Sequence, residues 1–399
     1  MPSAVIVDAV RTAGGKRHGK LSGWHSVDLA SETLKALIER NDLDPALVED
    51  VIMGCVTQIG AQGFNVARNA VLAAGFPESV PGTSVDRQCG SSQQAVHFAA
   101  QGVMAGQYDV VIAAGVEVMS LVPMGASAGA SLGVGLPFGE RVGARYAPKG
   151  GLVPQGIGAE MIAERWDLSR EDLDAFSASS HQKAARATAE GRFEREILPV
   201  AARHKDKETG KVTESGDLVT ADEGIRPDST VESLGQLKPA FKSDGRITAG
   251  NSSQITDGAS AVLIMSEEKA SALGLTPRAR FHAFAVAGDD PQIMLTAPIP
   301  ATTRILERAK LTIDDIDLVE INEAFAPVVL AWAKEHHADL ERVNVNGGAI
   351  ALGHPLGASG TKLMATLVNE LERTGGRYGL QTMCEGGGMA NATIIERLG

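Results

Sequence analysis

The sequence predicts an α/β protein made of two related halves. Short apolar strands alternate with helical patterns before residue 120 and again after residue 275, which is typical of a sheet covered by helices. Residues 110–114 form an unbroken apolar run of the kind found in strands buried on both faces. In each half a turn containing glycine and serine opens a helix that leads to such a strand. A duplicated plan of this kind is expected to bring the two turns together at one site.

The first half is expected to span residues 1–120 and to be completed by residues 252–274. Gly75 and Gly106 stand where they would close two of its helices at the C′ position. The helix that follows Cys89 is apolar on much of its circumference and should be buried. In chain order we expect a strand at 4–8, a helix at 27–40, a strand at 51–56, a helix at 65–74, a short strand before Cys89, a helix at 91–105, a strand at 109–115 and, after the middle segment, a strand at 260–265.

The middle segment, residues 121–251, is expected to form a loop domain inserted into the first half. Residues 124–135 are mostly Gly, Ala and Ser, a composition typical of a loop. Ser169 and Asp172 have the spacing of a helix capping box. Long insertions in compact enzymes are often functional. The expected elements are helices at 158–166 and 170–190 and an exposed hairpin or loop at 204–216.

The second half is expected to span residues 275–399. It repeats the alternation of strand and helix, and it contains a glycine-rich stretch over residues 346–360. In order, the expected elements are a helix at 301–309, a strand at 318–321, a helix at 327–336, a helix at 361–373, a strand at 378–383 and a last strand at 393–396.

The composition disfavours several classes of protein. The net charge is −12, whereas proteins that bind nucleic acid are more often basic. The 3 cysteines lie far apart and lack the spacing of a zinc site or a disulfide framework, so we expect no bound metal and a reducing, cytoplasmic location. We expect no signal peptide and no membrane partner, because no apolar run approaches the roughly 20 residues of a membrane span.

Cys89 is the first candidate for chemistry. It stands between a short strand and a helix, where unpaired N–H groups and the helix dipole favour a thiolate. The plain alternative is a small buried hydrophobic residue, and position alone does not decide between the two. Cys55 lies inside an apolar strand without polar neighbours in the sequence and is interpreted as structural.

Further polar motifs in the second half lie at the ends of strands or in glycine loops. Asn322 and Glu323 follow a buried strand, where sites in α/β proteins usually form, although they could simply cap the next helix. His354 is enclosed by glycines and a proline, which allow a ligand to approach closely. Cys384 begins a loop with consecutive glycines. The sequence therefore predicts that two thiols and a histidine face one site.

These groups divide the work of acyl transfer between them. A thiol activated by a histidine is a nucleophile for acyl transfer. A second thiol near its free pKa can exchange a proton with a carbon acid. N–H groups of glycine loops can stabilise a developing oxyanion or enolate. Together they are the parts needed to make or break a carbon–carbon bond next to a thioester.

In order and spacing, the Cys89 turn, Asn322-Glu323-Ala324-Phe325-Ala326, the Gly-His-Pro-Leu-Gly-Ala-Ser-Gly run that contains His354, and Cys384-Glu385-Gly386-Gly387-Gly388 resemble the motifs of the thiolase family. The resemblance covers essentially the whole chain. It implies the thiolase fold, in which two βαβαβαββ halves form five αβαβα layers with a loop domain inserted in the first half. It also implies a homodimer or homotetramer.

The resemblance implies a role for each motif residue. Cys89 resembles the nucleophile that becomes acylated, and His354 resembles the residue that activates it and helps to bind the thioester oxygen. Cys384 resembles the acid/base that exchanges a proton with the methyl carbon of acetyl-CoA. Asn322 resembles the residue that holds a water in an oxyanion hole beside His354. The N–H groups of Cys89 and Gly386 match the second oxyanion hole.

The resemblance also implies a binding surface for CoA, as a substrate rather than a permanently bound cofactor. Its loop-domain residues surround the CoA moiety, and two residues of the second half contact the pantetheine. These residues are Arg226, Ser233, Ala240, Phe241, Ala249, Ser253, Ala324 and Phe325. Without the resemblance, Arg226 reads as an ordinary surface arginine and Phe241 as a minor core residue.

The sequence departs from the family pattern at two places. Pro154-Gln155 stands where the acetoacetyl-forming relatives have a His-Met pair, so the acyl group is expected to differ from theirs. Glu385 stands where the family usually has an apolar residue, and we expect its side chain to point away from the site. A carboxylate facing Cys384 would disfavour the thiolate of that residue.

The predicted function is a CoA-dependent thiolase of lipid degradation, which cleaves 3-oxoacyl-CoA with CoA through an acyl-cysteine intermediate. One alternative is an acetyl-CoA C-acetyltransferase that forms acetoacetyl-CoA, and another is a thiolase for a bulky sterol side-chain acyl-CoA. A third, of a different class, is an acyl-CoA- or lipid-binding protein without turnover. A further hypothesis is a regulatory disulfide between Cys89 and Cys384, which requires Cα atoms within about 7 Å.

Overall fold

The computed structural model of the protein describes residues 2–129, 133 and 135–399. The strands, in chain order, are β1 (Ala4–Thr12), β2 (Gly15–Lys16), β3 (Asp50–Gly54), β4 (Gly82–Val85), β5 (Val110–Val118), β6 (Ile197–Leu198), β7 (Val200–Lys205), β8 (Val212–Val219), β9 (Thr256–Ser266), β10 (Ala279–Gly288), β11 (Leu318–Ile321), β12 (Tyr378–Glu385) and β13 (Met389–Arg397). The helices are α1 (Ser26–Arg40), α2 (Val66–Ala73), α3 (Ser91–Met104), α4 (Glu140–Tyr146), α5 (Gln155–Arg165), α6 (Arg170–Ala189), α7 (Val231–Gly235), α8 (Glu267–Ala272), α9 (Pro298–Ala309), α10 (Ala326–His336), α11 (Ala349–Leu352) and α12 (Ser359–Thr374).

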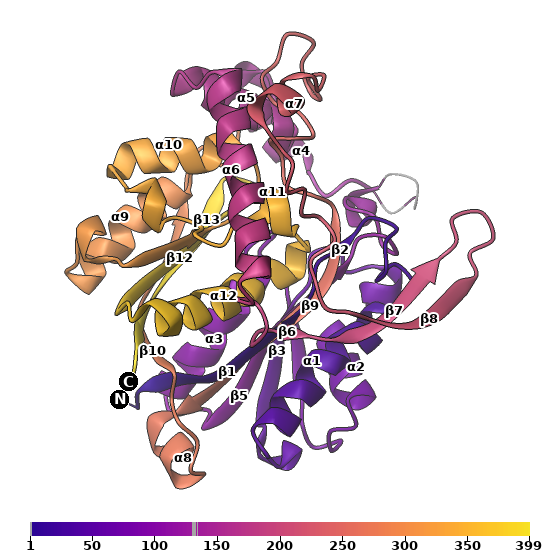
Figure 1. The fold of residues 1–399 in the computed structure, drawn as a ribbon, viewed down its shortest axis with the longest axis vertical. Helices are drawn as coiled ribbons and strands as arrows, with labels where there is room; N and C mark the ends of the chain where they lie inside the picture. The colour runs from indigo at the N-terminus through magenta and orange to yellow at the C-terminus, as the bar shows by residue number, and fades with distance from the viewer. Residues whose placement is uncertain (1, 130–132, 134) are drawn as a thin grey trace.

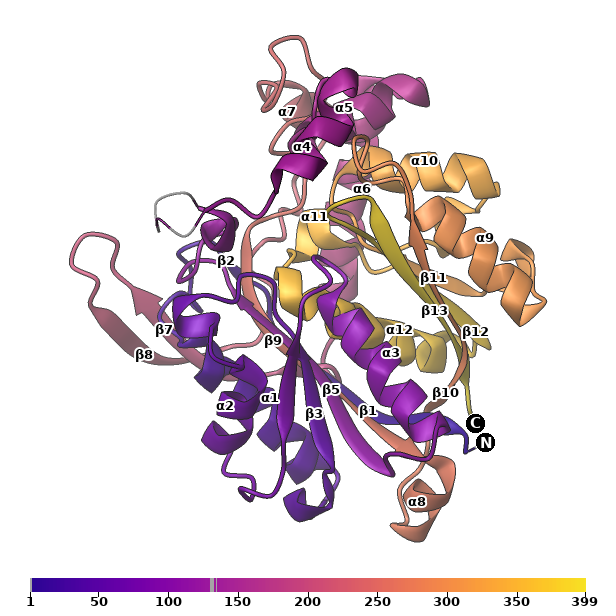
Figure 2. The ribbon, with the colours of Figure 1, turned by 180° about the vertical axis from the view of Figure 1, so that it is seen from behind.

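One long mixed sheet joins the two halves of the protein. Its strands run in the order β11-β12-β13-β10-β1-β9-β5-β3-β4, and the halves meet where β1 and β10 pair antiparallel with Val5 opposite Arg280. Helices α3 and α12 lie against each other in the middle of the molecule, and the termini lie side by side at one end (Figures 1 and 2). The predicted α/β architecture is confirmed.

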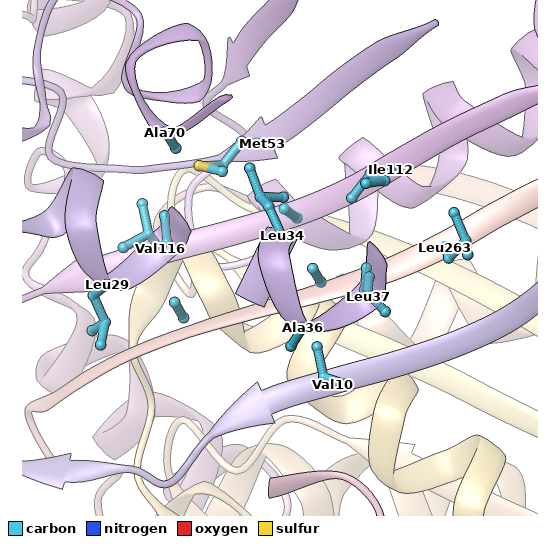
Figure 3. Close-up of a cluster of buried hydrophobic side chains, with 14 of the residues drawn as sticks. Val10, Leu29, Leu34, Ala36, Leu37, Met53, Ala70, Ile112, Val116 and Leu263 are labelled. Carbon is cyan, nitrogen blue, oxygen red and sulfur yellow. The ribbon is translucent and has the colours of Figure 1, made fainter. Parts of the chain in front are cut away.

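The buried side chains show how the layers form. In β1, Val5 and Val10 pack into a core with α1 and α2, whereas Ile6 faces a second core shared with α3 and α12. Figure 3 shows part of the first core, where side chains of α1 meet those of β1, β3 and β5. A third core joins α9 and α10 to the sheet of the second half. Helices α3 and α12 are therefore enclosed between layers, with other helices outside.

Most expected elements occur close to their expected places, and the differences are local. Gly75 and Gly106 have φ values of 76°, as a C′ position requires, and Ser169 and Asp172 form the expected capping box. The polar run after residue 200 is a two-stranded ribbon of β7 and β8. Helices α4, α7 and α8, which the sequence did not predict, have at most 7 residues and show little periodicity. No helix in the described part of the chain is long and apolar enough to cross a membrane.

Gly360 allows the two central helices to touch through their backbones. A methyl group at this position would lie 2.1 Å from the backbone nitrogen of Gln93 in α3. This contact sets how closely the first turn of α12 approaches the helix that follows Cys89. The glycine is therefore required by packing and not by its φ angle.

We expect Gly360→Ala to lower the free energy of unfolding by about 2 kcal/mol or more, because the added methyl group forces two buried backbones apart. Urea unfolding followed by circular dichroism measures the change. The matched control is Gly143→Ala in α4, where nothing lies within 4 Å and alanine is the better helix former. Equal stability of the two variants would contradict the backbone contact.

Candidate functional site

Cys89 lies in a sharp turn between β4 and α3. Gln88, immediately before it, has a φ of 50°, and Gly90, immediately after it, is the N-cap of α3. Ser91 fastens the turn, because its hydroxyl donates to the carbonyl of Gln88 over 2.5 Å and accepts from the N–H of Arg87 over 2.9 Å. The side chain of Cys89 is thus held in a fixed place, and the residue is only 5% exposed.

The surroundings of Cys89 favour the thiol over the thiolate in the ligand-free protein. Burial, and after it the charge of Glu385, raise the pKa of the Cys89 thiol to about 12. The N–H groups of Cys89 itself and of Gly386 hydrogen-bond to the sulfur and act in the opposite direction. The expectation that the helix start would favour a thiolate was therefore wrong for the resting state, because desolvation outweighs the local dipoles.

His354 is buried as a neutral imidazole with one defined tautomer. Burial lowers its pKa to about 3, and the charge of Lys362 acts in the same direction. Its Nδ1 is 2.5 Å from the hydroxyl of Ser359, which in turn donates to the carbonyl of Pro355 over 2.9 Å. Because that hydroxyl proton is already engaged, Nδ1–H must donate to Ser359. The lone pair is therefore on Nε2, which can accept a proton.

Asn322 lies on the opposite side of the imidazole. Its Nδ2 is 3.4 Å from His354 Nε2, and its Oδ1 is buried without a hydrogen-bond partner among the described residues. Neither Asn322 nor Glu323 caps the following helix, because the N-cap of α10 is Phe325 and it receives no side-chain bond. Asn322 therefore presents a free polar oxygen beside the histidine.

Glu323, the neighbour of Asn322, has a structural role. Its carboxylate accepts hydrogen bonds from Ser180, from Asn344 and from the N–H of Ile350, over 2.7–3.1 Å. These bonds tie α6 and the start of α11 to the end of β11. The carboxylate is paired through both oxygens, and Glu323 is not among the residues that line the cavity of Cys89 and His354, so it holds the site together without lining it.

Cys384 lies near the end of β12 and is completely buried. Its pKa is raised well above the usual range by burial, then by the nearby Cys89 and by Glu385. Both cysteines are free thiols. Cys384 packs into an apolar cluster with Ala324 and Phe325, which form part of the cavity wall. It is not among the residues that line the cavity, but it lies close enough to Cys89 for their charges to interact.

Two cavities meet at the site. Cys89 and His354 line the first, whose volume is about 200 Å³, and Gln254 lines both the first cavity and a second one of about 540 Å³. Of the residues expected to bind CoA, those on the first cavity are Phe241, Ser253, Ala324 and Phe325, and those on the second are Arg226, Ser233 and Ala249. Ala240 lines neither cavity and is exposed beside Phe241. The two cavities therefore adjoin at Gln254, and Cys89 lies on the first of them.

Several residues at the site were missed by sequence reasoning. Gln254 lines both cavities, and its amide donates to the carbonyls of Gly224 and Ile350. Glu117 is completely buried and accepts N–H bonds from Val56 and Gly357, so it anchors the histidine loop to the first half. A single acidic residue in an apolar strand was the available signal for Glu117, whereas no local pattern marks Gln254. The described residues contain no cluster of three or more potential metal ligands.

The chain matches known proteins along its whole length. The model of the thiolase N-terminal domain matches residues 4–268, and that of the thiolase C-terminal domain matches residues 275–397. The steroid 3-ketoacyl-CoA thiolase FadA6 of Mycobacterium tuberculosis is 52% identical over 400 residues, which cover 100% of this chain and 95% of that protein. A 3-ketoacyl-CoA thiolase of Aliivibrio fischeri is 46% identical and is covered completely by the match.

The fold is similar to that of a solved acyltransferase. The crystal structure of an acetyl-CoA acetyltransferase from Bacillus anthracis superposes with a TM-score of 0.88 at 38% sequence identity. The match covers 100% of this chain and 99% of that one.

Proposed function

Because the chain belongs to the thiolase family and is an acyltransferase, we propose that it cleaves 3-oxoacyl-CoA with CoA into acetyl-CoA and a shortened acyl-CoA. Its activity is CoA-dependent thiolysis in lipid degradation. The observation that carries the proposal is the shared cavity of Cys89 and the neutral, Nδ1-protonated His354. A nucleophilic thiol needs such a base when its own pKa is high.

The first step forms the acyl-enzyme. Nε2 of His354 takes the proton of the Cys89 thiol, and the sulfur attacks the 3-keto carbon. The N–H groups of Cys89 and Gly386, which converge on the sulfur, stabilise the alkoxide. The carbon–carbon bond then breaks and acetyl-CoA leaves as an enolate. His354, now carrying a proton on Nε2, and a water held by Asn322 bind the enolate oxygen, while the thiol of Cys384 protonates its carbon.

The second step releases the product and restores both thiols. The Cys384 thiolate takes the proton of an incoming CoA thiol, whose sulfur attacks the acyl-Cys89 thioester. As the shortened acyl-CoA forms, the leaving sulfur of Cys89 recovers the proton from His354. The proton count closes without a metal or redox step, so we propose that the enzyme holds no permanently bound cofactor.

We propose that CoA occupies the two cavities that adjoin at Gln254. Arg226 is exposed on the second cavity, where a cation would meet the phosphates of CoA. Phe241 and Phe325 line the first cavity and are packed edge to face, with their ring centroids 6.0 Å apart. This apolar surface suits the pantetheine arm. This assignment supports residues 121–251 as a CoA-binding loop domain, inserted between residues 1–120 and 252–274, with residues 275–399 as the second half.

The acyl group is proposed to be larger than acetyl. Gln155, the first residue of α5, lines the first cavity together with Met119 and Met124, which are long and adaptable apolar side chains. The steroid thiolase among the relatives makes a bulky sterol side chain the second candidate. An acetyl-CoA C-acetyltransferase that forms acetoacetyl-CoA is the third, and the structural neighbour carries a name of that kind.

A kinetic survey tests the acyl group. We expect kcat/KM for thiolysis to be at least about tenfold higher for medium-chain or sterol side-chain 3-oxoacyl-CoA than for acetoacetyl-CoA, because each buried methylene adds apolar contact. Gln155→Ala, which enlarges the same wall, should widen the range of accepted chains. A strict preference for four carbons would identify the acetyltransferase instead. If no substrate is turned over and Cys89 never carries an acyl group, the protein only binds acyl-CoA.

We propose that the protein works in the cytoplasm as a homodimer or homotetramer, with acyl-CoA and CoA as its small-molecule partners. The support for self-association is local. β4 is the last strand of the sheet, and Phe64, at 96% exposure, is a large apolar side chain facing solvent. Light scattering of the purified protein gives the number of subunits directly.

A further inference from the structure

Glu385 is a buried acid beside the turn that carries Cys89. It is the last residue of β12, follows Cys384, and has no exposed surface. Neither of its carboxyl oxygens has a hydrogen-bond partner among the described residues. An ionised carboxylate in such a place loses its hydration without compensation, so the neutral acid is strongly favoured. The catalytic steps proposed above do not use this group.

The carboxyl of Glu385 supports the turn that carries Cys89. A methyl group at Gly90 would lie 2.1 Å from Glu385 Oε1, so the carboxyl fills the space that any side chain at position 90 would need. Asn391 holds the same turn from β13, because its Nδ2 donates to the carbonyl of Gly90 over 2.9 Å. We expected this side chain to point away from the site; it does not line the cavity of Cys89, but its carboxyl packs against the turn that carries Cys89. Alternation along β12 turns it from Cys384 toward the turn of Cys89.

We propose that Glu385 is a positioning residue of the thiolase site, whose neutral carboxyl supports the Gly90 turn and whose ionisation places a negative charge beside Cys89 and slows the reaction of that thiol. This proposal rests on the proposed role of Cys89 as nucleophile. It concerns the protonation of Cys89 rather than the identity of the substrate.

The charges around Glu385 are consistent with a switch above neutral pH. Burial raises the pKa of Glu385 to about 8, with Arg87 acting against the shift and Asp86 adding to it. Because this pKa is raised, the carboxyl is neutral at lower pH and ionises as the pH rises through about 8. The other titratable groups nearby are Cys89 and Cys384, both of whose pKa values the charge of Glu385 raises. On α3, His97 also interacts with Arg87, but its pKa of about 3 keeps it neutral throughout.

The test is the pH dependence of Cys89 alkylation by iodoacetamide, read by mass spectrometry on the peptide that contains Cys89. In the wild-type protein, ionisation of Glu385 opposes that of Cys89, so the rate should rise only shallowly between pH 7.5 and 9.5. In Glu385→Gln we expect a steeper rise that begins at lower pH, with a rate at pH 9 at least about threefold above wild type, which is roughly half a pKa unit. Superimposable profiles would overturn the proposal.

A second variant keeps the test decisive if Glu385→Gln does not fold. Arg87→Gln removes the cation that lowers the pKa of Glu385, while Arg87 is not among the groups that shift the pKa of Cys89. Glu385 should then stay neutral to higher pH, and the shallow region of the alkylation profile should move upward by about half a pH unit or more. An unchanged profile would again overturn the proposal.

Alkylation does not require turnover, so the outcome is separate from that of the proposed function. If the protein shows the expected alkylation profiles but does not catalyse thiolysis, the proposed role of Glu385 is supported and the proposed function is wrong. If the protein cleaves 3-oxoacyl-CoA but both variants have the same alkylation profile as the wild type, the proposed function is supported and the proposed role of Glu385 is wrong. Buried Cys55, measured in the same digest, should show no difference between variants and serves as the internal control.

Discussion

Replacing Cys89 with serine is expected to lower kcat for thiolysis by about 10⁴-fold or more, the scale on which enzymes lose activity when their nucleophile is removed. The thiol can pass its proton to Nε2 of His354, which is neutral and unprotonated there. A serine hydroxyl is a far weaker acid, and a histidine whose pKa is lowered to about 3 is too weak a base to activate it. The measurement is CoA-dependent loss of 3-oxoacyl-CoA, together with intact-protein mass spectrometry for the acyl adduct.

The matched control for Cys89→Ser is Cys55→Ser. Cys55 is a buried free thiol in the same half of the protein, and it does not line the cavity. Cys55→Ser should keep its kcat within about twofold but lose about 1–3 kcal/mol of stability, because a buried hydroxyl replaces a small apolar group. If Cys89→Ser instead cleaves substrate at the wild-type rate, the acyl-cysteine mechanism is wrong.

Replacing Cys384 with alanine is expected to separate the two halves of the reaction. Cleavage of 3-oxoacyl-CoA should fall by about 10³-fold, the size of a typical loss of a general acid, because no thiol remains to protonate the enolate carbon. Acyl transfer from a saturated acyl-CoA to Cys89 needs no proton at carbon. Cys384 would protonate the departing CoA in this step, but a thiolate is stable enough in water to leave without that proton, so the acyl-enzyme should still form, only more slowly. Exchange of the methyl protons of acetyl-CoA with deuterated water, followed by NMR, measures the lost step alone.

Two results would contradict the role proposed for Cys384. One is methyl proton exchange at the wild-type rate in Cys384→Ala. The other is loss of acyl-Cys89 formation in a folded protein, which would mean that Cys384 acts on the nucleophile rather than on the carbon acid. Cys384→Ser, which keeps the volume and a weaker acid, should recover part of the exchange.

Local sequence patterns were sufficient for most of the fold. The apolar run at 110–114 and the helix after Cys89 follow from hydrophobic periodicity, and Ser169 with Asp172 follows from capping chemistry. Short elements such as α7 were not predicted, because 5 residues carry too little periodicity to be distinguished from a loop. The length of β9, which runs from Thr256 to Ser266, depends on its partners β1 and β5 rather than on its own residues.

In the candidate site, too, some residues could be predicted from local sequence patterns and others could not. Cys89, His354 and Cys384 could be identified because each stands at a strand end or in a glycine loop, where close approach of a ligand is the simplest reason for the pattern. Gln254 could not be identified, because its place between two cavities results from contacts with Gly224 and Ile350. A residue that bridges distant segments leaves no local signal.

The sequence by itself therefore determined the architecture, the family and which side chains are available for chemistry. Only the tertiary structure decided their protonation. Cys89 rests as a thiol because the fold removes it from water, and the tautomer of His354 is set by the hydroxyl of Ser359. Glu385 meets the turn of Cys89 although nearly 300 residues separate them. Burial and charge depend on every segment that surrounds a group, so no local pattern encodes them.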